Sequence, residues 1–193
     1  EKDLANAPAS FKTVDAKPND HGEKFKVQVY CKDCTGCGVC VDQCPMTKVA
    51  GKEALTWSSI EAEEAVGEAV NEKFFDELPD NVMGKNTTKT IKGAMLRKPL
   101  FEFSGACAGC GETPYVKLVS QLFGENAIVA NATGCSSIYS GTFPTIPYTK
   151  TKEGRGPAWA NSLFEDNAEF GFVMRLAVDA NRELLKENVE KVL

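Results

Sequence analysis

Four closely spaced cysteines, followed at once by a proline, constrain this chain more than any other feature. They lie in the stretch CTGCGVCVDQCP and are Cys34, Cys37, Cys40 and Cys44. The gaps between them are two, two and three residues, a spacing typical of 4Fe-4S ligation, in which three thiolates bind one cluster and the fourth binds another. Glycines within the gaps allow a tight turn that aims several sulfurs at one point. The run therefore predicts an iron–sulfur loop.

Two other uses of these cysteines have to be weighed. A disulfide framework suits a small secreted chain, but no signal peptide is visible and four cysteines this close cannot easily pair with one another. A zinc site needs two pairs of ligands, and a second pair exists at Cys107 and Cys110, so zinc stays open. The Cys-Pro ending favours iron–sulfur.

Cys31 complicates the ligand assignment. It precedes Cys34 by the same two-residue gap, so Cys31 could replace Cys44 in an alternative quartet. The iron–sulfur spacing leaves Cys31 spare, as a small buried hydrophobic residue.

Composition narrows the class of protein. The 193 residues carry a net charge of −5 and are 42% hydrophobic, which is normal for a packed core and gives no indication of nucleic-acid or anionic-membrane binding. No apolar run approaches the roughly 18 residues of a membrane-spanning helix. Eight cysteines without a secretory signal predict a reducing compartment and metal chemistry.

Local patterns in the first half predict one short strand and one helix between loops. Residues 1–20 are polar and loop-like, and alternation of apolar and polar residues predicts a strand over 24–30. A capping box from Ser58 to Glu61 predicts the start of a helix. The apolar face of that helix would carry Val66, Val70 and Phe74. Residues 85–98 lack periodicity and are predicted to be a connector.

A parallel βαβ unit is predicted in the second half. Leu100–Phe103 and Ala127–Ala130 are short apolar runs. Between them, Thr113 can cap a helix that ends at Gly124. Two strands joined by a helix of this length are expected to pair in parallel.

Three further cysteines follow these two predicted strands. Cys107 and Cys110 come after the first, and Cys135 after the second, so parallel pairing would bring them together at the carboxyl edge of the sheet, where open α/β sheets bind cofactors. A lone CxxC suggests a redox dithiol, but a third cysteine favours a metal cluster whose fourth ligand is not evident. No Walker or GxGxxG motif supports nucleotide binding.

A last helix is predicted from a capping box that joins Ser162 to Glu165. Its apolar stripe is expected to be plain core and comprises Phe170, Val173, Met174, Ala177, Leu184, Leu185 and Val189. Gly171, between two phenylalanines, suggests close helix packing.

Together the motifs resemble the pyruvate:ferredoxin (flavodoxin) oxidoreductase family. The resemblance spans nearly the whole chain and is carried by CTGCGVCVDQCP, FEFSGACAGCGETPYVKLVSQLFG, NATGCSSIY and GRGPAWANSLFEDNAEFGFVMRLAVD. It implies an internal fragment of a longer polypeptide, an expectation that fits a start at Glu1 without methionine and an end within a helical pattern.

The resemblance also implies a domain organisation and a fold class. Residues 1–50 would be the C-terminal part of an α+β ferredoxin-like domain for two 4Fe-4S clusters, and residues 51–98 a helical linker. Residues 99–193 would be the start of an α/β domain with a parallel sheet, which binds thiamine diphosphate and has a proximal 4Fe-4S site.

Ligand roles follow from the same resemblance. Three thiols of the first run would bind one outer cluster and the last thiol the other; they are Cys34, Cys37 and Cys40, and Cys44. The proximal cluster would be bound by Cys107, Cys110 and Cys135, and thiamine diphosphate would be contacted by Glu112 and Cys135. No catalytic residue is expected within the chain, and magnesium would accompany the diphosphate in the whole protein.

The implied parent is an enzyme that oxidatively decarboxylates pyruvate with coenzyme A to acetyl-CoA and CO2 and passes electrons through 4Fe-4S clusters to ferredoxin or flavodoxin. It is expected to be a homodimer in the cytoplasm, or in a hydrogenosome-like organelle of a eukaryote, without nucleic-acid or membrane partners. The chain alone is expected to be inactive. A pyruvate:NADP oxidoreductase relative and a non-catalytic zinc or iron–sulfur module are the alternatives.

Overall fold

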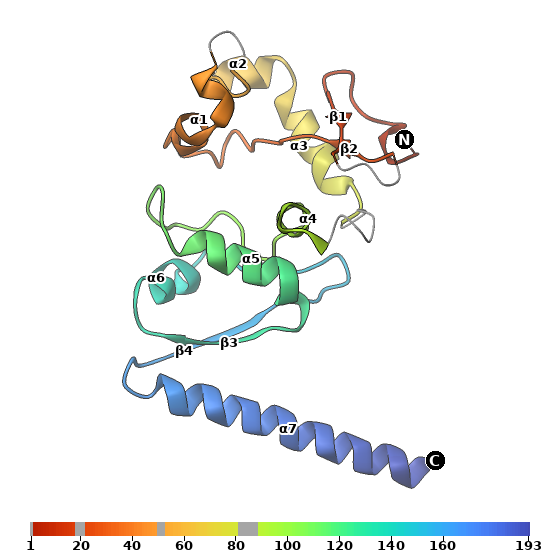
Figure 1. Ribbon diagram of the computed structural model, residues 1–193, viewed down its shortest axis with the longest axis vertical. Helices are drawn as coiled ribbons and strands as arrows, with labels where there is room; N and C mark the ends of the chain where they lie inside the picture. The colour runs from red at the N-terminus through yellow and green to blue at the C-terminus, as the bar shows by residue number, and fades with distance from the viewer. Residues whose placement is uncertain (1, 18–21, 50–52, 81–88) are drawn as a thin grey trace. The chain divides into compact units, whose positions relative to one another are not determined.

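The computed structural model describes residues 2–17, 22–49, 53–80 and 89–193. The chain divides into two compact units (Figure 1). Unit 1 comprises Glu1–Lys98 and Cys107–Gly111, and unit 2 comprises Pro99–Ala106 and Glu112–Leu193. Each unit combines helices with a two-stranded sheet, antiparallel in unit 1 and parallel in unit 2. This mixture is compatible with an α/β fold, while the predicted domain assignments stay predictions.

The described residues of unit 1 form short helices joined by loops, with one short pair of strands. Its elements are η1 (Lys2–Leu4), β1 (Val14–Asp15), β2 (Lys24–Phe25), α1 (Val39–Gln43), η2 (Pro45–Lys48), α2 (Ile60–Ala65), α3 (Glu68–Glu77) and α4 (Ile91–Met95). Of the predicted strand 24–30, only the first two residues pair, and their partner β1 lies in the stretch predicted to be loop. The prediction was too long because polar groups of 28–31 bond to α3 instead of a neighbouring strand.

The helix predicted from Ser58 is divided in two. Ser59, one residue later, caps α2 by accepting a hydrogen bond from the backbone N–H of Ala62 at 3.2 Å. Gly67, with φ of 90°, separates α2 from α3, and only glycine adopts that backbone conformation readily. The interruption rotates the predicted apolar face away from the core, and Val66 and Val70 are exposed.

Phe11 lies at the centre of the core of unit 1. Phe11 is buried and packs edge-on against Phe74, with ring centroids 4.9 Å apart, and beside Phe75 at 6.5 Å. Burying one such side chain contributes about 1.5–3 kcal/mol. Asn71, on the same helix, is 1% exposed and its side chain hydrogen-bonds to that of Ser10. The segment predicted to be loop therefore supplies the centre of this core.

The predicted connector 85–98 contains a short helix in its described part. Thr90 caps α4 by accepting a hydrogen bond from the backbone N–H of Gly93 at 3.0 Å, and Ala94 is buried. Residues 81–88 lie outside the described residues.

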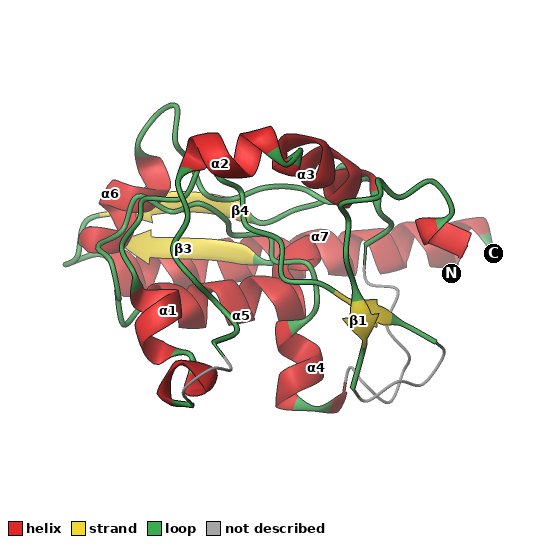
Figure 2. Ribbon diagram, turned by 90° about the horizontal axis from the view of Figure 1, so that it is seen from above, coloured by secondary structure: helices red, strands yellow, loops and turns green. Residues whose placement is uncertain are grey.

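Unit 2 is built on two parallel strands. Its elements are α5 (Thr113–Phe123), η4 (Gly124–Asn126), β3 (Ile128–Ala132), α6 (Cys135–Gly141), β4 (Ala158–Ser162) and α7 (Asn167–Val192). The two strands pair in register from Ile128 with Ala158 to Ala132 with Ser162. Figure 1 shows α5 and α6 on one face of this sheet and α7 on the other, and Figure 2 shows the strands in yellow.

The predicted βαβ unit has the wrong first strand. Within the described residues, Leu100–Phe103 forms no strand and makes only an isolated antiparallel bridge from Phe101 to Tyr148. The parallel partner of β3 is β4, which follows it in the chain. Leu100 and Phe101 are instead buried as core, and the backbone N–H of Leu100 donates to Ser120 Oγ at 3.1 Å. Packing against α5 thus takes the place of pairing.

The helix between these segments was predicted nearly as it stands. Gly124 ends α5, as expected, but Glu112 rather than Thr113 is the residue at its N-cap. Val119 and Leu122 of the predicted apolar face are exposed, whereas Ser120 and Gln121 are buried. The buried face is rotated because Gly124 lies directly against Leu100, where an added Cβ would approach Leu100 Cδ1 to 3.0 Å.

The last helix begins later than predicted. Ser162 ends β4, and Asp166 is the N-cap residue of α7. No residue of α7 is buried, so its apolar stripe is not plain core as predicted. The expectation for Gly171 is confirmed, since an added Cβ there would lie 3.4 Å from Ala130 Cβ on β3.

Aromatic rings form the core of unit 2. Phe101 packs edge-on against Tyr139 and Tyr148, at centroid distances of 5.9 and 5.2 Å.

Across the residues that the structure describes, no helix is both long and apolar enough to cross a membrane.

Candidate metal and cofactor sites

The first cysteine loop opens with a tight turn. The carbonyl of Tyr30 accepts hydrogen bonds from the backbone N–H groups of Asp33 and Cys34, at 3.1 and 3.0 Å. The loop then enters α1, which carries Cys40 and ends at Cys44, whose N–H donates to the carbonyl of Val41 at 3.3 Å. These local bonds fix the backbone at Cys34 and Cys44, at the two ends of the run.

Gly38 lies where the loop enters α1. It lies at the N-cap of α1 with φ of 80°, a conformation that suits glycine. A Cβ at this position would lie 3.1 Å from the ring of Trp57. Only a residue without a side chain lets the loop pass this close to the indole ring.

The second cysteine loop belongs to unit 1, although its flanking residues belong to unit 2. The N–H of Cys110 donates to the carbonyl of Cys107 at 3.0 Å, which closes the CxxC turn. A Cβ added to Gly109 would lie 4.0 Å from Val39 Cγ2 on α1. The two cysteine loops are therefore neighbours, a proximity that no sequence pattern indicated. The predicted convergence with Cys135 rested on a sheet that does not form between Leu100–Phe103 and β3.

Cys135 lies at the carboxyl edge of the parallel sheet, as predicted. It is the first residue of α6, and two residues separate it from the end of β3 at Ala132. The backbone N–H and the Oγ1 of Thr133 both donate to the carbonyl of Ser162, at 3.1 and 2.8 Å, and so tie this turn to the end of β4.

Neutral side chains hold the same edge together. Asn161 donates to Thr133 Oγ1 at 3.2 Å and accepts from Asn131 at 2.9 Å. Asn167, the first residue of α7, donates to the carbonyl of Ala130 and to Ser162 Oγ, at 3.3 and 3.1 Å. The sequence analysis did not predict this hydrogen-bond network, although the three asparagines next to apolar runs could have indicated it.

Glu112 lies at the start of α5, where its carbonyl accepts the N–H groups of Tyr115 and Val116. Its side chain makes no capping bond. Burial raises the pKa of Tyr148, a hydrogen bond with Ser140 opposes this rise, and the negative charge of Glu112 adds to it.

The thiols fit an iron–sulfur cluster in their chemistry. All eight cysteines are free, and thiolate is the usual cluster ligand. Five are exposed to solvent: Cys34, Cys37, Cys40, Cys107 and Cys135. Among the described residues, no group of three or more His, Cys, Asp or Glu side chains is arranged to hold a metal ion. The predicted ligand sets, and the contacts of Glu112 and Cys135 with thiamine diphosphate, stay predictions.

The fold and these motifs together define a cysteine-rich protein of mixed helix and strand content. Comparison with known proteins identifies the family to which it is related. No protein-family model matches the chain. The chain is 54% identical over 192 residues to pyruvate:ferredoxin oxidoreductase of Moorella thermoacetica, with 99% of this chain and 16% of that protein covered. It is 53% identical over 190 residues to a putative pyruvate-flavodoxin oxidoreductase of Synechocystis, with 97% and 16% covered.

A third relative differs in its named acceptor. Mitochondrial pyruvate dehydrogenase (NADP+) of Euglena gracilis is 46% identical over 188 residues, with 97% of this chain and 10% of that protein covered. The chain spans 16% of the length of the first two relatives. It is thus homologous to a segment of the pyruvate:ferredoxin/flavodoxin oxidoreductases, which are oxidoreductases by name, and the resemblance drawn from its motifs is confirmed.

Proposed function

We propose that this chain is the electron-transfer and cofactor-binding segment of an enzyme that oxidatively decarboxylates pyruvate with coenzyme A, giving acetyl-CoA and CO2, and reduces ferredoxin or flavodoxin. The observation that carries the proposal is identity of about half the residues across nearly the whole chain to proteins named for pyruvate oxidation. Thiamine diphosphate would supply carbanion stabilisation and iron–sulfur clusters one-electron transfer when bound.

The chain's own residues would hold these groups. In unit 1, Cys34, Cys37 and Cys40 would bind one cluster, and Cys44 a second. Cys107, Cys110 and Cys135 would bind the proximal cluster, and Glu112 and Cys135 would contact thiamine diphosphate, which carries magnesium in the whole protein. The hydrogen-bonded turns at Cys34 and Cys110 orient the backbone for this role. We place the enzyme in the cytoplasm or a comparable reducing compartment, as a homodimer.

Anaerobic reconstitution with iron and sulfide tests the metal assignment. We expect bound iron and sulfide, a paramagnetic resonance signal after dithionite, and loss of iron in a Cys37→Ser variant. Zinc without such a signal would instead support a non-catalytic zinc module. A His21→Ala variant, which removes no thiol, is the control.

Activity tests the remaining part of the proposal. The chain alone should not oxidise pyruvate, because the residues that bind pyruvate and coenzyme A are expected elsewhere in the parent. In the full-length protein, pyruvate-dependent reduction of ferredoxin or flavodoxin is expected, and reduction of NADP+ alone would favour the alternative acceptor.

A further inference from the structure

One polar network in unit 1 holds the segment that leads into the first cysteine loop. Glu68, Glu72 and Asp76 on α3 are spaced four residues apart, and residues at this spacing share one face of a helix. We call these three residues the carboxylate clamp. Each of them accepts a hydrogen bond from residues 28–31.

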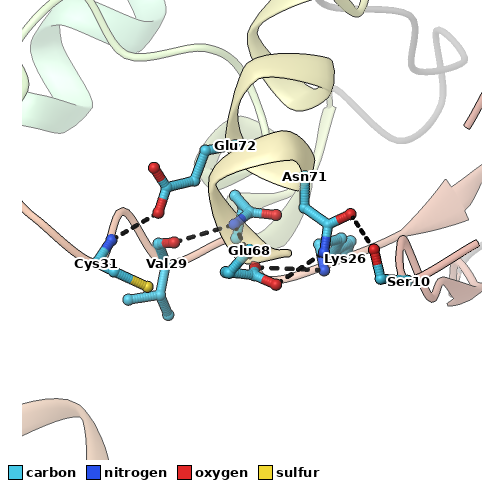
Figure 3. A network of polar contacts seen from close by, with 8 residues as sticks. Ser10, Lys26, Val29, Cys31, Glu68, Asn71 and Glu72 are labelled. Atoms are coloured by element: carbon cyan, nitrogen blue, oxygen red, sulfur yellow. Dashed lines mark hydrogen bonds and ion pairs between the residues drawn. The ribbon is translucent and has the colours of Figure 1, made fainter. Parts of the chain in front are cut away.

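Each carboxylate of the clamp accepts from a different residue of this segment. Glu68 Oε1 accepts from Gln28 Nε2 at 2.6 Å, and Asp76 Oδ1 accepts from the Tyr30 hydroxyl at 2.5 Å. Glu72 Oε1 accepts from the backbone N–H of Cys31 at 2.7 Å. Figure 3 shows this last bond, with the Cys31 nitrogen directed at the Glu72 carboxylate.

The clamp is anchored on the buried side of α3. Asn71, 1% exposed, donates to Glu68 Oε2 at 2.8 Å and accepts from the Ser10 hydroxyl at 2.9 Å. Lys26 Nζ lies 3.9 Å from Glu68 and 4.9 Å from the centre of the Phe11 ring. Because this anchor lies in the core of unit 1, it holds the Glu68 carboxylate in place.

Cys31 is the cysteine most affected by these charges. Its thiol is partly buried. Burial, a hydrogen bond with Glu72 and the charges of Glu72, Glu68 and Glu63 raise the pKa of Cys31 to about 11. A thiolate is the form that binds metal, so these surroundings disfavour metal binding by Cys31. The first assigned ligand, Cys34, lies only three residues further along the chain.

We propose that the carboxylate clamp keeps Cys31 out of the metal-ligand set of the adjoining loop, with Glu72 as the positioning residue that holds the backbone of Cys31 against α3. The inference rests on the proposed function in one respect, the assignment of Cys34, Cys37 and Cys40 as ligands. The inference selects between the two sets of four cysteine ligands that the spacing leaves open, because the alternative set requires Cys31.

Alkylation of the unloaded chain tests the clamp without any metal. Trypsin releases residues 27–32, in which Cys31 is the sole cysteine, so its reaction with iodoacetamide at pH 9 can be followed by mass spectrometry. Glu72→Ala is expected to speed this reaction about tenfold, the factor for one pKa unit. Glu187→Ala, which removes an exposed helical carboxylate of unit 2, should leave the rate unchanged.

Amide hydrogen exchange distinguishes the effect of Glu72 on the backbone of Cys31 from the effect of the Glu72 charge on the thiol. Glu72→Gln removes the charge but keeps an oxygen that accepts the Cys31 N–H. It should therefore preserve amide protection at Cys31 while it speeds alkylation, whereas Glu72→Ala should both lose that protection and speed alkylation. Unchanged alkylation and unchanged amide exchange in Glu72→Ala would overturn the inference.

Loading with iron and sulfide tests the ligand choice itself. In the wild-type chain, loading should leave Cys31 alkylation unchanged, and in Glu72→Ala it should protect Cys31. Protection of Cys31 in the wild-type chain would overturn the inference. If the wild-type chain binds no iron, the metal assignment fails, but the alkylation and exchange results on the unloaded chain still decide whether the clamp exists.

Discussion

The segments before Cys34 in unit 1 and before Cys135 in unit 2 are held by different kinds of hydrogen bond. In unit 1, carboxylates of α3 accept hydrogen bonds from the segment before Cys34. Glu68, the first of them, accepts from Gln28 and from Asn71. In unit 2, the turn before Cys135 is tied by the neutral groups of Thr133 and Asn161. Hydrogen bonds to charged groups are stronger but depend on protonation. The segment before Cys34 should therefore be more sensitive to acid than the turn before Cys135.

The largest effect is expected at the buried anchor of unit 1. Asn71→Ala removes the partner of Ser10 and Glu68 at a site that is 1% exposed, which costs about 2–3 kcal/mol. Urea unfolding followed by tryptophan fluorescence can measure the loss, because Trp57 belongs to unit 1 and Trp159 to unit 2.

The matched substitution in unit 2 is Asn161→Ala, at an exposed residue. It should lower the free energy of unfolding by less than Asn71→Ala and should change the Trp159 signal, not that of Trp57. Equal losses in both units would contradict the difference between them. Trp57→Phe and Trp159→Phe backgrounds separate the two signals.

Acid should weaken unit 1 before unit 2, with a smaller loss than Asn71→Ala. Burial alone would raise the pKa of Glu68, but hydrogen bonds from Asn71 and Gln28 and the charge of Lys26 lower it below its ordinary value of 4.5. A lowered pKa contributes stability that is present above pH 4.5 and is lost as the pH falls through the folded-state value.

A pH series of urea unfolding checks this expectation. Glu68→Gln should flatten the acid dependence of the Trp57 transition, because it removes the titrating group and keeps an acceptor oxygen. An unaltered slope in that variant would show that other carboxylates govern acid unfolding.

A moderate effect is expected at the carboxyl edge of the sheet. Thr133→Val deletes the hydroxyl that donates to the Ser162 carbonyl and accepts from Asn161, at a cost of about 1 kcal/mol. The Trp159 transition should shift and alkylation of Cys135 should become faster, with no change at pH 4 relative to pH 7. Thr145→Val, at another exposed threonine that donates to a carbonyl, is the control.

The smallest effect is expected at the rim of the carboxylate clamp. Tyr30→Phe removes an exposed hydrogen bond to Asp76 and should cost about 0.5 kcal/mol. The measurement is again the Trp57 unfolding midpoint. A loss as large as that of Asn71→Ala would mean that the rim, not the buried anchor, holds the segment.

Local signals predicted the parts of the fold that depend on near neighbours. Gly124 ends α5, as the sequence indicated, and the close packing expected at Gly171 is found, although only the structure shows that its neighbour is Ala130 of β3. Capping boxes were less reliable: Ser59 caps α2 in place of Ser58, and Ser162 became the last residue of β4. A serine with an acidic residue three positions on is compatible with several backbone conformations, and packing selects among them.

The sequence by itself determined which thiols are available, the turns that present them and the relationship to pyruvate oxidoreductases, because ligand spacing and glycine placement act over a few residues. Tertiary structure alone decided that β3 pairs with β4, that Gly109 lies against Val39, and that Glu72 meets Cys31 across 41 positions of the chain. Such contacts depend on which surfaces are buried together, and burial is a property of the folded chain that no short stretch of sequence contains.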